Sequence, residues 1–284
     1  GGMTISSSFK LMDENGSAGD LDAGFTLAFT DGSKLDVLNA GNASGSHAIS
    51  VPGSAGAEGV ATTSVNQAQT GLDFATSSTA LGVEYHTASD FVADGLKMSF
   101  SASTDSGAAA TETYRVDSHY AIGATYVTDL GDSSVTIGAG ISESEGSKTG
   151  TAVTNDDGGF HVGFSAVTGD LTVAVGFADG TKAGVNSAAA GVGELDGDAI
   201  KAGVKYVSGD LTFNVGIASG DAKDNTVGSS GGSDDSIDTT SASVSYAVAS
   251  GVTAILGYTT MEASNEGAST DDGSAWYIGA NMAF

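Results

Sequence analysis

Apolar and polar residues alternate along most of this chain, and the last eleven residues, SAWYIGANMAF, show the pattern most clearly. Trp276 and Ile278 belong to a set of apolar residues, whereas Tyr277 and Gly279 belong to a set that is mostly small or polar. A period of two is the signature of a strand whose two faces meet different environments. The segment 274–284 is therefore predicted to be a strand.

The same period recurs from one end of the chain to the other and predicts about 14 strands. Tight turns are expected at 167–170, 207–210 and 249–251, where short glycine-containing sequences separate two alternating segments. Short turns at one end and long loops at the other describe an up-and-down sheet with two unlike ends. The long loops, rich in Gly, Ser, Thr, Asn and Asp, are expected at 146–157, 181–196, 222–237 and 264–273.

The chemistry of the two faces favours a membrane barrel over a soluble sandwich. One face carries Val, Ile, Leu and aromatic residues almost without charge, and the other carries Gly, Ser, Thr, Asn and a few charges. No amphipathic helical pattern could cover the apolar face, and about 14 strands are too many for one open twisted sheet. Closure removes the edges, and a bilayer covers an apolar outside. We therefore predict an all-β fold, a closed antiparallel transmembrane β-barrel; a sandwich with a buried terminal strand is the alternative.

Composition excludes several classes of function. The 284 residues are interpreted as one domain over 1–284, and the lack of cysteine excludes disulfides and thiolate chemistry. Nine basic residues against 35 acidic ones argue against nucleic acid as a partner, because phosphate binding needs clustered Lys and Arg. No Gly-x-Ser-x-Gly, His-Glu-x-x-His or phosphate-loop motif is present. We expect a protein that is not an enzyme and requires no cofactor.

Several stretches resemble the general porin family of Gram-negative bacteria, especially its alphaproteobacterial branch. GGMTISSSFKLMDENG and AGFTLAFTDGSKLDVLNAG are similar to porin strands that precede a long loop, and ALGVEYHTASDF resembles the strand that follows it. The terminal strand ending in Phe284 looks like the family's assembly signal. The resemblance covers essentially the whole chain in pattern. It implies a 16-stranded barrel, of which about 14 strands are visible and the first hairpin would precede Gly1.

The resemblance also implies an arrangement for function. In the family, the third loop folds into the lumen and narrows the pore, and the poorly alternating segment 39–79 matches that loop. The implied function is a homotrimeric porin in the outer membrane, through which ions and small hydrophilic solutes diffuse passively. The insertion machinery would read the C-terminal strand, and Trp276 and Phe284 would lie at the membrane interface. One departure is charge, because the family sets several arginines opposite acids and this chain has one arginine.

Charged residues and histidines of the polar face are the candidates for lining such a pore. Glu58 and Asp73 are expected on the acidic side of the constriction, with Arg115 on the opposed basic side. The acidic balance most simply favours cations, although much of that charge lies in the expected external loops. The full set is Lys10, Lys34, Asp36, Glu58, Asp73, Glu84, His86, Lys97, Arg115, Asp117, His119, Lys201 and Lys205.

Three acidic segments, TNDDGG, GSDDSID and STDDGS, raise an alternative. Hard cations such as calcium or magnesium favour clustered carboxylate oxygens, yet none of the segments has the spacing of an EF-hand loop. They could face solvent, or bridge through divalent cations to anionic lipopolysaccharide at the outer rim. The alternative function is a structural or adhesive surface β-protein with calcium-binding loops and no open pore. The candidate ligands are Asp156, Asp157, Asp234, Asp235, Asp271 and Asp272.

Overall fold

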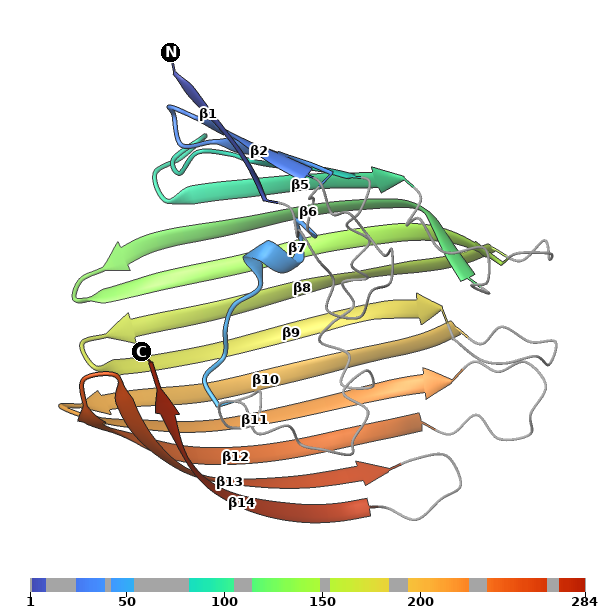
Figure 1. Cartoon of the computed structure of the whole chain (residues 1–284). Coiled ribbons are helices and arrows are strands. Elements are labelled where there is room, and N and C mark those ends of the chain that lie inside the picture. The colour runs from blue at the N-terminus through green and yellow to red at the C-terminus, as the bar shows by residue number, and fades with distance from the viewer. Residues whose placement is uncertain are drawn as a thin grey trace, which may run out of the picture. The chain divides into compact units, whose positions relative to one another are not determined.

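The computed structural model describes residues 2–8, 24–38, 42–53, 82–104, 114–148, 154–183, 194–224, 234–264 and 271–283. Within these ranges it contains 14 β-strands and one short 3-10 helix. The strands form one sheet in which hydrogen-bonded neighbours follow chain order from β1 to β14 (Figure 1). Neighbouring strands are antiparallel. The prediction of an all-β antiparallel fold with about 14 strands is confirmed.

The first four strands are short, and the other ten have between 9 and 17 residues. Tilted strands of roughly 9–11 residues are enough to cross the hydrocarbon of a bilayer. Among the described residues, no helix is long and apolar enough to span a membrane. The elements are β1 (Met3–Ser8), β2 (Gly24–Phe29), β3 (Lys34–Val37), η1 (Gly45–His47), β4 (Gly82–His86), β5 (Leu96–Thr104), β6 (Tyr114–Leu130), β7 (Ser133–Lys148), β8 (Thr154–Thr168), β9 (Leu171–Ala183), β10 (Glu194–Ser208), β11 (Leu211–Asp224), β12 (Asp234–Ala249), β13 (Val252–Ser264) and β14 (Asp271–Met282).

The chain divides into two compact units. Unit 1 comprises Gly1–Ala48, Phe74–Tyr126 and Gly138–Phe160. Unit 2 comprises Ile49–Asp73, Val127–Ile137 and His161–Phe284. One domain over the whole chain stays a prediction.

Tight turns join four pairs of neighbouring strands at one end of the sheet. Gly131, Gly169 and Gly209 each open a two-residue turn with φ of 64°, 54° and 59°, and an aspartate without positive φ follows each glycine. Positive φ at the first central position alone is the mark of a type II′ turn, whose twist matches that of the strands. A fourth turn uses Gly251 with φ of 75°. The turns predicted from VTGD, VSGD and ASG are confirmed.

The four connections predicted to be long loops are shorter than expected. In each of them the preceding strand continues into the start of the predicted loop, and the following strand begins before its end. The prediction that the six candidate aspartates lie in loops is therefore wrong. A polar sequence can continue a β-ladder, since the hydrogen bonds are made by backbone groups whatever the side chains. Among the six side chains, only that of Asp272 is described, and it is exposed. Asp156 and Asp157 belong to β8, Asp234 and Asp235 to β12, and Asp271 and Asp272 to β14.

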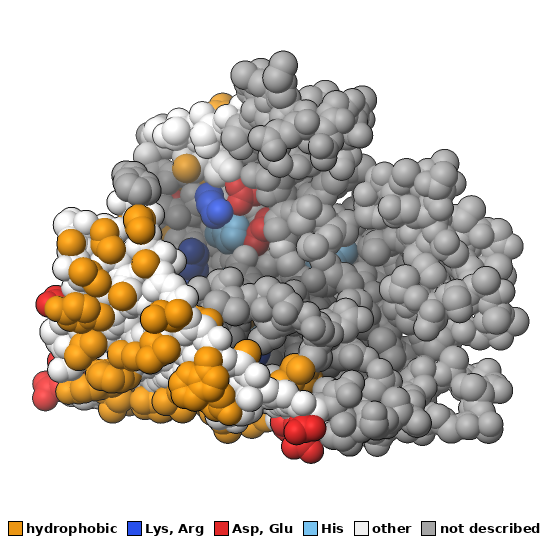
Figure 2. Space-filling model, turned by 60° about the horizontal axis from the view of Figure 1, so that its bottom comes forward, with side chains coloured by type: hydrophobic (Ala, Val, Ile, Leu, Met, Phe, Trp, Pro, Cys, Tyr) orange, Lys and Arg blue, Asp and Glu red, His pale blue; other side chains and the backbone are white. Residues whose placement is uncertain are grey.

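One face of β9–β14 is apolar along whole cross-strand rows, and we call it the outer face. In the row nearest its middle, Val204 of β10 lies opposite Val173 of β9 and Val215 of β11. Directly opposed side chains are the unit of stabilisation in a sheet. Figure 2 shows hydrophobic side chains crowded over the strand surface turned to the viewer, with acidic side chains at its borders. The row continues through Ala242, Tyr258 and Trp276, and the next row contains Leu171, Tyr206, Phe213, Val244, Leu256 and Ile278.

The exposure of the two faces is the reverse of that in a soluble protein. Val204 is 40% exposed and Trp276 72% exposed on the outer face. In unit 1, Tyr120 and Ile122 of β6 are exposed, whereas Ala121 between them is 3% exposed and His119, in the same alternate set as Ala121, is 2% exposed. Large apolar side chains of these strands thus meet the surroundings, while His119 and Ala121 of the alternate set are covered, in the direction that the sequence pattern predicts.

Acidic residues form cross-strand rows of their own beyond the apolar rows, at the end of the strands away from the tight turns. Asp198 of β10 lies directly opposite Asp179 and Asp221, and Glu262 of β13 lies directly opposite Asp238 and Asp272. Like charges directly opposite one another are destabilising, so this end of the outer face belongs in a medium that screens them.

The height of the apolar band fits a bilayer. From Asp198 to Ser208 the strand β10 rises ten steps, or about 33 Å along its own axis. With the tilt of about 40° that outer-membrane barrels have, this length corresponds to about 25 Å of membrane thickness.

An arginine in the middle of the outer face tests whether that face meets lipid. We expect Val204→Arg to lower the free energy of unfolding from lipid vesicles by about 2–4 kcal/mol, because the cation would lie near the bilayer midplane. Ser243→Arg, on the opposite face of β12, is the matched control and should cost much less. Guanidinium unfolding followed by strand circular dichroism measures both, and equal losses would contradict a lipid-facing outer surface.

Candidate functional site

A compact polar cluster lies where β3, β4 and β5 pair in unit 1. Asp36 is directly opposite Glu84, and Lys34 is directly opposite His86. On the next strand, Ser99 lies opposite His86. Because directly opposed residues share one face, the register alone brings these side chains together. Asp36, Glu84 and His86 are buried, although all three are polar.

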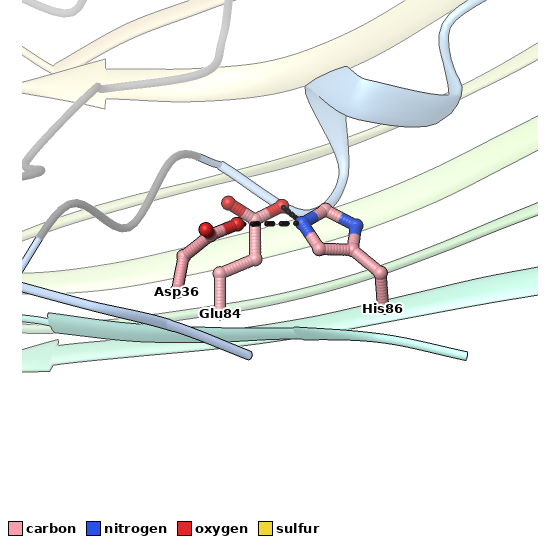
Figure 3. Close-up of side chains that lie close together, drawn as sticks. All are labelled: Asp36, Glu84 and His86. Atoms are coloured by element: carbon pink, nitrogen blue, oxygen red, sulfur yellow. Dashed lines mark ion pairs between the residues drawn. The ribbon is translucent and has the colours of Figure 1, made fainter. Parts of the chain in front are cut away.

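The contacts of Asp36 show how the cluster tolerates burial. Lys34 Nζ lies 3.0 Å from Asp36 Oδ2, and the Thr26 hydroxyl donates to Asp36 Oδ1. His86 Nε2 lies 3.3 Å from Asp36 Oδ2 and 3.4 Å from Glu84 Oε1 (Figure 3). Buried charges persist in proteins where they are paired in this way.

The segment 42–48 covers this cluster with a turn that contains η1. The Asn42 side chain accepts from the backbone N–H of Ser44 at 2.9 Å, which is the arrangement of an Asx-turn. The backbone N–H of Ala43 donates to Ser101 Oγ at 3.0 Å, and Ser46 Oγ donates to Glu84 Oε1 at 3.3 Å. The turn is therefore tied by side chains to the polar face of β4 and β5.

His47 makes the deepest contact of this turn. Its Nδ1 lies 2.6 Å from Thr125 Oγ1 on β6, and its Nε2 lies 2.8 Å from Ser99 Oγ. Ser99 Oγ also lies 2.7 Å from His86 Nδ1, so one hydroxyl joins the two imidazoles. The ring of His47 is buried. A Cβ added to Gly123 of β6 would collide with the Ala43 carbonyl and the His47 ring, so glycine allows this approach.

Glycines of unit 2 likewise allow the segment 49–53 to approach the strands closely. A Cβ on Gly163 would lie 2.7 Å from Ile49 Cβ, and one on Gly216 would lie 2.7 Å from the Pro52 carbonyl. A Cβ on Gly203 would overlap the Pro52 carbonyl oxygen. Ser241 Oγ donates to the Gly53 carbonyl. These strands lack side chains where the segment lies against them.

The structure brings together four of the thirteen candidate residues, Lys34, Asp36, Glu84 and His86. His119 is buried on β6 and Lys97 is exposed on β5; Lys201 is half-buried and Lys205 exposed on β10. Trp276 stacks at a tilt on Tyr258, with 4.4 Å between ring centroids. Outside the described residues are Lys10, Glu58, Asp73 and Phe284, and the side chains of Arg115 and Asp117.

Sequence reasoning missed His47, Ser99 and Thr125. His47 lies in a segment without periodicity, so no pattern assigned it a face. Glycines in the polar set of the strands were the signal that could have indicated a covering segment, because glycine inside a strand often marks the close approach of another backbone.

No family model and no curated protein matches this chain. Solved structures do match. The outer membrane channel DcaP of Acinetobacter baumannii has a TM-score of 0.63 and 10% identity over 99% of this chain and 81% of that one. The trimer form of OmpT, an outer membrane protein of Vibrio cholerae, has a TM-score of 0.56 and 16% identity over 92% and 79%. A structure described as a porin has a TM-score of 0.56 and 16% identity over 92% and 81%.

The chain has the fold of outer-membrane β-barrels. Its strand order starts at β1 and ends at β14, and no pairing joins these two among the residues that the structure describes. Closure of the barrel therefore stays a prediction.

A side chain at Gly203 tests the approach of 49–53 to the sheet. We expect Gly203→Val to destabilise the protein by about 1–3 kcal/mol, the usual cost of overpacking, because Pro52 has to move. Gly279→Val on β14 is the matched control, since a Cβ there meets nothing within 4 Å. Guanidinium unfolding of both variants measures the difference. Equal stability of the two variants would show that the segment does not lie against Gly203.

Proposed function

We propose that this chain forms a water-filled channel in the outer membrane of a Gram-negative bacterium, through which ions and small hydrophilic solutes diffuse passively. The observation that supports it is the reversal of the two faces, with apolar rows exposed outside and polar residues covered inside. A sheet with this polarity is stable where lipid surrounds it and its interior is aqueous. The fold of outer-membrane channels in the similar structures is consistent with this proposal.

Closure of the sheet is part of the proposal. An open edge inside hydrocarbon would leave backbone N–H and C=O groups without partners, each at a cost of several kcal/mol. The edges at β1 and β14 would pair with each other or with further strands, and 16 strands in total is our expectation. Barrels of that size enclose an aqueous channel.

The segment 39–79 is proposed to be the loop that narrows the channel. Its described part, 42–53, is held to the polar face by hydrogen bonds from Ala43, Ser46 and His47 in unit 1. In unit 2 its part 49–53 lies against Gly163, Gly203 and Gly216. A segment attached at so many points would reduce the cross-section of the proposed channel.

Cation preference is proposed from the distribution of charge. Acids outnumber bases 35 to 9 in the chain, and two of the three charged residues in the buried cluster are acids. The exposed acidic rows that include Asp198 and Glu262 lie at the end of the sheet with the longer connections. These acids lie on the outer face, and a border of negative charge at that end would raise the local concentration of cations around the proposed channel.

The remaining proposals concern assembly. We propose a homotrimer without catalytic activity, in contact with membrane lipid and lipopolysaccharide. The outer-membrane insertion machinery would recognise its C-terminal strand. Calcium or magnesium at the acidic segments stays a prediction.

Single-channel recording tests the proposed function. The purified, folded protein in a planar bilayer should give large, stable conductance steps, because its lumen is aqueous. Under a salt gradient, the reversal potential should have the sign of a cation-preferring pore. Folded, membrane-inserted protein that gives no steps would contradict the channel.

A further inference from the structure

Asp36, Glu84 and His86 direct three ligand atoms toward one point on the polar wall formed by β3 and β4. One carboxylate oxygen of each acid and one imidazole nitrogen all lie within 4.8 Å of one another, and all three residues are buried. Figure 3 shows the three side chains pointing toward one another. We propose that this triad binds a divalent transition-metal ion of the zinc class. The inference concerns the folded wall of unit 1 and does not require an open channel.

The distances in the triad suit a shared ion better than direct hydrogen bonds. His86 Nε2 lies 3.3 Å from Asp36 Oδ2 and 3.4 Å from Glu84 Oε1. A hydrogen bond between an imidazolium and a carboxylate is shorter, at about 2.7–2.9 Å. Two atoms that each lie about 2.0–2.1 Å from a tetrahedral zinc ion are about 3.4 Å apart. Nε2 is buried and makes no hydrogen bond within the described part of the chain.

The hydrogen bond on the other side of the His86 ring supports the same assignment. With the proton on Nδ1, His86 donates to Ser99 Oγ over 2.7 Å, and the Nε2 lone pair faces the two acids. Ser99 then donates to His47 Nε2, and His47 Nδ1 donates to Thr125 Oγ1. Each donor in this series of three hydrogen bonds has one acceptor. Metal-bound histidines are oriented in this way by a hydrogen bond from the second ring nitrogen.

The donor set favours a particular class of metal. Imidazole suits zinc, copper, nickel and iron, whereas calcium and magnesium prefer oxygen ligands alone. Two carboxylates and one neutral imidazole fill three positions of a zinc-type site and leave a fourth for water. The site thus differs in chemistry from the purely acidic segments.

Lys34 is the competitor for this site. Its Nζ lies 3.0 Å from Asp36 Oδ2, the same oxygen that faces His86. The Lys34 side chain is 42% exposed, so it can turn into solvent when an ion binds. Loss of this ammonium group should therefore strengthen metal binding rather than weaken it.

Zinc titration of the full chain tests the proposal. The folded protein in detergent, stripped of metal and held in excess magnesium to saturate acidic oxygen sites, is titrated with zinc against a chromophoric chelator. We expect one zinc per chain. Glu84→Gln and His86→Gln should each weaken binding by at least about tenfold, and Lys34→Met should tighten it severalfold.

Two substitutions serve as matched controls. Glu262→Gln removes the same charge from an exposed position on β13, and Lys205→Met removes a lysine from β10. Neither should change the affinity for zinc. A protein that binds no zinc, or that loses affinity equally in Glu84→Gln and Glu262→Gln, would overturn the proposal.

A spectroscopic measurement on the unchanged chain covers the case in which a variant fails to fold. Copper(II) added at one equivalent should show hyperfine coupling to one imidazole nitrogen in electron paramagnetic resonance. Oxygen ligands alone would overturn the proposal. The conductance of the same preparation, recorded separately, distinguishes failure of the metal site from failure of the channel.

Discussion

This structure is governed by the requirement that every backbone N–H and C=O group has a hydrogen-bond partner within the sheet, because the two faces of the sheet meet different surroundings. A strand that passes through lipid has to pair on both edges, and its side chains then alternate between lipid and the interior of the sheet. The cross-strand rows through Val204 and Tyr206 show one result of this constraint, because residues far apart in sequence line up as continuous apolar bands. In the proposed membrane setting, the acidic rows through Asp198 and Glu262 would lie where lipid gives way to water.

The same constraint leaves the inner face available for function. In the proposed membrane setting lipid covers the apolar side, so the inner side needs no apolar core and can consist of serine, glycine and charged residues. Glycines at positions 123, 203 and 216 then allow a segment of backbone to lie directly on the wall. The buried cluster around Asp36 and His86 is a further consequence, because a polar face can hold charges that a hydrophobic core would exclude.

The strands could be predicted from the sequence because their signal is local and repeated. A period of two identified the 14 strands that the structure describes, and short glycine-containing sequences marked the tight turns at 167–170, 207–210 and 249–251. The ends of the strands were predicted less well, since polar segments such as those of Asp156 and Asp234 continue the ladder without an alternating pattern. The contacts of His47 could not be predicted, because they join it to Ser99 and Thr125, 52 and 78 residues away. The convergence of Asp36 with Glu84 depended on strand register, which alternation alone does not specify.

Depth-resolved fluorescence quenching of Trp276 tests the central claim, that the apolar rows face lipid. Trp276 is the only tryptophan in the chain, so its emission reports one position on the outer face. In vesicles that contain lipids brominated along the acyl chain, we expect strong quenching, together with weak quenching by aqueous acrylamide. Strong acrylamide quenching without any effect of brominated lipid would contradict the account, because Trp276 would then face water.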